Sequence, residues 1–120
     1  MNTQPTPYPL PSEAYRRGRL TSSAGPRLQL INDDGTSCAY GAILIGADIK
    51  PYTEDENEFS AISQKSVQFP CECVPSHVKA DWSAVLVHLY DDHVQLNPDF
   101  PETPRWTEER VIEWLEHEGL

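Results

Sequence analysis

The chain has 120 residues, of which 38% are hydrophobic, with 11 prolines against 6 glycines. This length suits one domain that buries its own core, and the proline content predicts a small core with many loops. The longest apolar run, residues 38–47, is about half of the ~20 residues that a membrane-spanning helix needs. The N-terminal residues lack the pattern of a signal peptide. Three cysteines, an odd number, favour reduced thiols and a cytoplasmic location.

The formal net charge is −10, and it is unevenly distributed. Residues 1–30 hold four arginines and one glutamate, a balance of +3, whereas residues 31–120 hold 5 basic and 18 acidic residues, a balance of −13. An acidic surface disfavours nucleic acid, because nucleic-acid binding depends on cationic contacts to phosphate. It suits a basic protein surface, although acidity also keeps a small protein soluble. The basic cluster Arg16, Arg17 and Arg19 is too short to indicate nucleic-acid binding and can pair with the acidic remainder.

The N-terminal part is expected to be a flexible, proline-rich arm over residues 1–12, followed by one globular domain over residues 13–120. Ser12 is the expected cap of a short helix that extends to Arg19. Residues 28–31 alternate like a short strand. The polar residues 32–35 then predict a turn, because Asn and Asp bond their own backbone and Gly accepts a positive φ.

The apolar run after this turn allows two structures. It is either a buried helix to about Ala47, capped by Thr36 or Ser37, or the second strand of a hairpin over residues 28–45. Its alanines and glycines favour the helix. Residues 48–70 are expected to be rich in loops, with an exposed acidic run at 54–58 and an edge strand near residues 66–69.

Two helices are predicted at the C-terminal end. The first starts at Ser76 or Asp81, and its apolar stripe has helical spacing. The stripe consists of Val78, Trp82, Val85 and Leu89. The second has Thr107 as its N-cap, acids in its first turn and Gly119 at its end, with Trp106 and Val111 as a hydrophobic staple. The predicted fold is therefore a small α+β domain with a short hairpin or sheet, a buried central helix and two C-terminal helices.

Three segments together resemble a group of small bacterial and phage proteins without an assigned activity. They are Asp34-Gly35-x-x-Cys38-Ala39-x-Gly41-Ala42, then Leu89-Tyr90-Asp91-Asp92, then Trp106-Thr107-x-Glu109 with the helix that follows. Tyr90 stands where those proteins more often have asparagine. The resemblance implies the same fold and a prokaryotic or phage origin, hence a bacterial cytoplasm, and it transfers no catalytic residue.

The segment Cys71-x-Cys73 with His77 is the sharpest candidate for chemistry. Two thiols and an imidazole can supply three zinc ligands, with Cys38, His88 or His93 as the fourth. The first pair is closer in sequence than in most zinc sites, and buried thiols that serve only packing are the alternative. A disulfide between Cys71 and Cys73 would close a strained ring.

Two further constellations are weaker candidates. Cys38 at a helix N-terminus would have a lowered pKa and, with a histidine and an aspartate, could imitate a nucleophile. The spacing of His88 and Asp92 by four residues, repeated by His77 and Asp81, permits a metal pair or a local His–Asp contact. Packing explains Cys38 more simply, and no catalytic residue is assigned.

The predicted function is therefore non-catalytic binding to a basic protein surface, with no direct binding to nucleic acid or membrane. An acidic phage or mobile-element inhibitor that docks on a nucleic-acid-handling complex of its host fits the size and charge. The acids expected to form the interface are Asp91, Asp92, Glu108, Glu109, Glu113 and Glu116. The alternative is a zinc-stabilised or cysteine-dependent protein, which includes an enzyme, that uses Cys71, Cys73 and His77 or Cys38.

Overall fold

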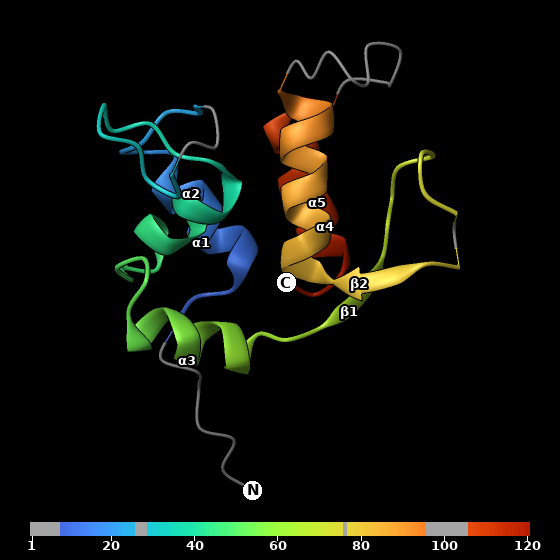
Figure 1. Ribbon diagram of the computed structural model, residues 1–120, viewed down its shortest axis with the longest axis horizontal. Helices are drawn as coiled ribbons and strands as arrows, with labels where there is room; N and C mark the ends of the chain where they lie inside the picture. The colour runs from blue at the N-terminus through green and yellow to red at the C-terminus, as the bar shows by residue number, and fades with distance from the viewer. Residues whose placement is uncertain (1–7, 26–28, 76, 96–105) are drawn as a thin grey trace, which may run out of the picture.

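The computed structural model describes residues 8–25, 29–75, 77–95 and 106–120 (Figure 1). Helices dominate, and two short strands form an antiparallel sheet, so the predicted small α+β domain is confirmed. The elements are α1 (Pro11–Gly18), α2 (Ala39–Gly46), α3 (Glu54–Ile62), β1 (Ser66–Gln68), β2 (Lys79–Asp81), α4 (Trp82–His88), the π-helix η1 (Leu89–Val94) and α5 (Glu108–His117). Among these residues, none of the helices has the length and apolar character to cross a membrane.

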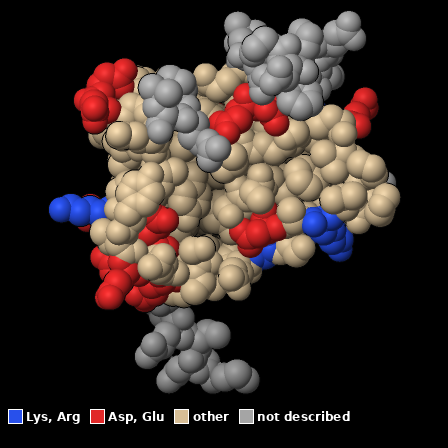
Figure 2. Space-filling model, in the orientation of Figure 1, with Lys and Arg blue, Asp and Glu red and all other residues tan. Residues whose placement is uncertain are grey.

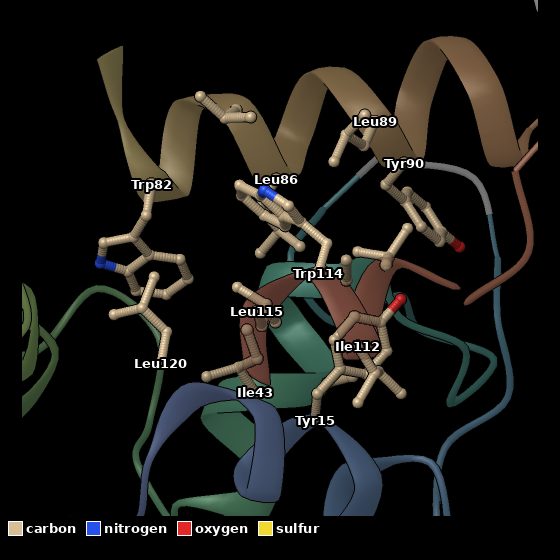
Figure 3. Close-up of a cluster of buried hydrophobic side chains, with 14 of the residues drawn as sticks. Tyr15, Ile43, Trp82, Leu86, Leu89, Tyr90, Ile112, Trp114, Leu115 and Leu120 are labelled. Atoms are coloured by element: carbon tan, nitrogen blue, oxygen red, sulfur yellow. The ribbon is translucent and has the colours of Figure 1, made fainter. Parts of the chain in front are cut away.

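The core lies between α4–η1 on one side and α1, α2 and α5 on the other (Figure 3). Trp82, Leu86 and Leu89 project from α4 and the start of η1 toward this core, and each is almost fully buried. Tyr90 lies deep in the same layer, where its hydroxyl donates a hydrogen bond of 2.6 Å to the carbonyl of Gly25. The aromatic and aliphatic layer therefore holds α4–η1 in place.

Helices α1 and α2 cross with their backbones in contact, because small residues face each other there. A Cβ atom on Gly46 would lie 1.7 Å from the carbonyl oxygen of Ala14, and one on Gly18 would lie 1.8 Å from that of Ala42. Backbone atoms cannot move aside as a flexible side chain can. Both positions therefore require glycine.

The substitution Gly46→Ala is expected to lower the free energy of unfolding by about 3 kcal/mol, the upper end of overpacking costs. In a helix without this crossing, the same change would stabilise by roughly 0.5–1 kcal/mol. The sign of the change in the free energy of unfolding therefore shows whether the two helix backbones are in contact at Gly46. Urea unfolding of the wild type and the variant measures it, and a stabilised Gly46→Ala protein would contradict the crossing.

The predicted helix after the turn is confirmed as α2, but its predicted cap is wrong. Cys38 is the N-cap, and its Sγ accepts a hydrogen bond from the Gly41 amide at 3.4 Å. Thr36 and Ser37 do not cap it because their hydroxyls are used elsewhere: Thr36 donates to Asp34, and Ser37 accepts from Arg19.

The short sheet or hairpin predicted near residues 28–45 is wrong, and the described residues 29–31 do not form the predicted short strand. Within the described residues, only isolated bridges occur there, from Ser37 to Ala24 and to Ile31. The sheet instead joins β1 and β2, so the predicted strand near residues 66–69 is confirmed in β1. Its partner was missed because a strand of three residues has no recognisable periodicity.

The acidic run at residues 54–58 was expected to be a loop and is the first half of α3. Thr53 caps this helix by accepting from the Glu56 amide, and three acids in the first turn suit the helix dipole. The run is nonetheless largely exposed, as predicted. Phe59 is the buried residue of the helix.

At the ends of the chain the predictions were partly correct. Helix α5 has the predicted Thr107 cap, and Gly119 follows it with a φ of 78°. Asp81 caps α4, but Val78, a member of the predicted stripe, lies before β2 and therefore outside the helix. Ser12 lies inside α1, where its hydroxyl donates to the carbonyl of Leu120 at 2.8 Å. Of the predicted arm, residues 1–7 lie outside the described residues.

Candidate metal centre

Two cysteines and two histidines bring their donor atoms together beside the end of α4. The loop between β1 and β2 rises alongside α4 (Figure 1) and contributes Cys71 and Cys73. The helix contributes His88 at the end of α4 and His93 in η1. All four ligand atoms lie within 4.8 Å of one another.

The distances between these donor atoms suit a tetrahedral ion. The two Sγ atoms are 3.1 Å apart, and His88 Nε2 lies 3.2 Å from Cys71 Sγ and 3.1 Å from Cys73 Sγ. His93 Nε2 lies 3.4 Å from Cys73 Sγ and 3.2 Å from His88 Nε2. With Zn–S of about 2.3 Å and Zn–N of about 2.0–2.1 Å, a zinc tetrahedron has edges of roughly 3.3–3.8 Å. Small side-chain rotations would open the group to that size.

The π-helix explains why two histidines five residues apart share one face. In an α-helix, residues i and i+5 point about 140° away from each other. In a π-helix, hydrogen bonds link i and i+5 and bring these residues one above the other. Such a bond joins the Gln95 amide to the Tyr90 carbonyl at 2.9 Å. The rings of His88 and His93 are accordingly 4.9 Å apart between centroids. Single π-turns of this kind are common at functional sites.

The cysteine side of the centre is partly shielded from solvent. Cys71 is buried and Cys73 is exposed, and neither forms a disulfide. Burial, and then the neighbouring Cys73, raise the pKa of the Cys71 thiol to about 11. Phe69 packs edge-on against the ring of His88, with centroids 5.5 Å apart. The centre therefore lies at the edge of the core, where the Cys71 thiol is buried and Cys73 is exposed to solvent.

Asp92 orients His88 from behind. Its Oδ2 accepts a hydrogen bond of 2.7 Å from His88 Nδ1, which directs the lone pair of Nε2 toward the two thiols. Carboxylates hold metal-ligating histidines in this way and increase their basicity. The predicted His88–Asp92 contact is thus present. It belongs to the candidate centre, because His88 is one of the four donors.

The substitution Asp92→Asn is expected to weaken zinc binding about 10- to 100-fold, the usual effect of losing such a carboxylate. Titration against a competing chelator measures the affinity. Asp91→Asn is the matched control, since the carboxylate that bonds His88 belongs to Asp92. Equal affinities for the wild type and Asp92→Asn would contradict this role.

His77 was predicted as the third ligand, and the structure does not bring it to the centre. Its side chain is exposed in the turn before β2 and is not among the four converging donors. His88 and His93, predicted only as alternatives for a fourth ligand, lie there instead. The spacing C-x-C-x14-H-x4-H was the available signal, because paired cysteines followed by paired histidines are typical of zinc sites.

Cys38 is also separate from this group. It is 1% exposed, and its thiol contacts the Leu30 carbonyl at 3.8 Å in addition to the Gly41 amide. The described residues place neither His88 nor His93 in a common donor group with it. Its contact with the Gly41 amide is that of a helix N-cap.

The acids predicted as an interface are largely engaged within the chain. Arg16 forms a fork on Glu109 at 2.9 Å and reaches Glu116 at 3.2 Å, and Arg19 holds Glu108 at 2.8 Å. The prediction that the arginine cluster pairs with the acidic body is thereby confirmed for Arg16 and Arg19. Because these cations offset part of the negative charge of α5, the surface of that helix is less negative than its sequence alone indicates.

Comparison of the chain with protein-family models, with curated proteins and with solved structures finds no match. The resemblance to small bacterial and phage proteins stays a prediction.

Proposed function

We propose that this protein is a zinc-stabilised, non-catalytic domain in which Cys71, Cys73, His88 and His93 hold one zinc ion. The observation that supports this proposal is the convergence of four donor atoms from two separate segments within 4.8 Å. Two thiolates and two imidazoles are a common ligand set of structural zinc. Four protein ligands fill the tetrahedron, whereas catalytic zinc keeps one position for water or substrate.

The ion would fasten the β1–β2 loop to the helix. Among the described residues of this loop (69–75, 77 and 78), the backbone hydrogen bond is a local one of 3.0 Å from the Val78 amide to the Pro75 carbonyl. The two cysteines and Phe69 contact the histidines of α4–η1, and Val74 packs against the core. Zinc binds thiolates, so loading the site displaces the thiol protons. The loop would then become part of the folded unit.

Elemental analysis of the purified protein tests the proposal. One zinc per chain is expected for the wild type and for His77→Ala, whose exposed imidazole lies outside the group. A clear loss is expected for Cys73→Ser and for His88→Ala. Wild-type protein that binds no zinc after refolding with excess zinc would refute the site, and so would full zinc content in both ligand variants.

A second candidate function is the binding of a basic macromolecule, favoured by the net charge of −10. An inhibitor of phage or mobile-element origin that docks on a basic host surface is one form of it. On the acidic face of α5 (Glu109, Glu113 and Glu116), Arg16 of α1 pairs with Glu109 and Glu116. Among the residues that the structure describes, no ion pair includes the exposed α3 acids Glu54, Asp55 or Glu58.

A further inference from the structure

An apolar groove lies between α3 and the segment that leads into α1. Much of its apolar lining comes from Tyr8, Leu10, Phe59, Ile62 and Leu120. Lys65 also lines it, and its ammonium donates a hydrogen bond to the Glu118 carbonyl. Leu10 is 57% exposed and Ile62 is 46% exposed, which is unusual for large aliphatic side chains that lie side by side. We call this feature the α3 groove. Phe59 forms its floor and packs edge-on against Tyr8, with ring centroids 5.6 Å apart.

Carboxylates stand beside the α3 groove. Glu54, Asp55 and Glu58 are exposed on α3, and Figure 2 shows acidic side chains gathered at the lower left, where Figure 1 places this helix. Partial desolvation raises the pKa of Tyr8, and the carboxylates of Glu58 and Asp55 raise it further, so these acids act directly on the lining of the groove. Apolar surface and negative charge therefore adjoin.

The size and charge of the α3 groove restrict its occupant. Its volume of about 240 Å³ is below the roughly 300–1,000 Å³ of small-molecule sites, so it suits one or two side chains. Acids beside it disfavour phosphate-rich nucleic acid and anionic membranes. A second copy of the same surface would place like charges face to face, because a twofold contact repeats one patch on both subunits.

We propose that the α3 groove binds a short segment of a partner protein that inserts an apolar side chain beside Ile62 and places flanking lysines or arginines against Glu54, Asp55 and Glu58. This inference rests on the second candidate function and gives it a site on α3 instead of α5. The apolar anchor supplies affinity, and the charges supply orientation and a faster association. Binding therefore weakens as salt increases.

Selection from a displayed library of random peptides tests the groove without knowledge of the natural partner. Selected peptides are expected to contain an apolar residue flanked by lysine or arginine. Their affinity is expected to fall at least tenfold for Ile62→Asp and for the double variant Asp55→Lys/Glu58→Lys. Leu20→Asp is the matched control, because Leu20 is 84% exposed and does not line the groove, and it should bind as the wild type does.

Two outcomes separate the failure of the groove from the failure of the binding function. Basic peptides that keep their affinity for both groove variants but lose it for Glu113→Lys would overturn the α3 groove and leave the function in place. A selection that enriches no basic peptide would overturn both. All variants are checked for native melting temperature before they are compared.

Discussion

Removal of zinc is expected to lower the melting temperature by about 15 °C. A ligand at 1,000 times its dissociation constant stabilises the folded state by about 4 kcal/mol, and each kcal/mol shifts the midpoint of a domain of this size by several degrees. Structural zinc sites bind tightly enough to exceed that ratio at micromolar zinc. Differential scanning calorimetry before and after dialysis against a chelator measures the shift.

Zinc removal should first loosen the residues around the site and only then unfold the whole domain. Cys71 and Cys73 connect the β1–β2 loop to His88 and His93, whereas α1 and α2 contact each other through Gly18 and Gly46. Hydrogen exchange should therefore accelerate in the loop and in η1 after zinc removal, with little change in α1 and α2. His88→Ala should have a low melting temperature with and without chelator. An unchanged melting temperature of the wild type in chelator would contradict the stabilising role.

Loss of the Arg19 guanidinium is expected to cost about 3–5 kcal/mol, the usual effect of breaking a buried ion pair. The side chains of Arg19 and Glu108 are only 14% and 24% exposed. Arg19 also donates to Ser37 Oγ at 2.8 Å and to the Ser37 carbonyl at 3.0 Å. Arg19→Ala would leave the Glu108 carboxylate half-buried with the hydroxyl of Tyr15 as its remaining partner in this network.

Urea unfolding of Arg19→Ala and Arg19→Lys measures this network. Lysine should recover only part of the loss, because its single ammonium cannot reproduce the planar fork of arginine. Arg17→Ala is the matched control, since Arg17 pairs with Glu13 at the surface, where such pairs contribute about 0–1 kcal/mol. Equal losses for Arg17→Ala and Arg19→Ala would mean that the network adds no more than a surface pair.

Sequence reasoning identified the elements whose signals are local. Thr107 and the acids after it predicted α5, and the small apolar residues of the central run predicted α2. Helix α3 was missed because its first five residues are all polar and resemble a solvated loop, although Thr53 was available as its cap. The pairing of β1 with β2 was missed because the partners Val67 and Ala80 are separated by a loop that no turn motif marks.

The candidate site was half predictable, for a geometric reason. Cys71 and Cys73 stood out by proximity in sequence, and His77 seemed the natural third ligand for the same reason. The structure selects His88 and His93 instead, because a π-turn aligns residues that an α-helix would hold about 140° apart. No pattern in a single sequence marks where a helix widens. The sequence spacing of the two cysteines and two histidines was therefore the feature from which the four ligands could have been predicted.

X-ray absorption at the zinc edge of the refolded protein tests the centre most directly, since it reports the atoms bound to the metal. Two sulfur neighbours at about 2.3 Å and two nitrogen neighbours at about 2.0–2.1 Å are expected. The zinc that Cys73→Ser still retains should have one sulfur neighbour fewer, and His77→Ala should leave the spectrum unchanged. A first shell of nitrogen and oxygen alone, or one with a single sulfur in the wild type, would contradict the assignment of Cys71, Cys73, His88 and His93.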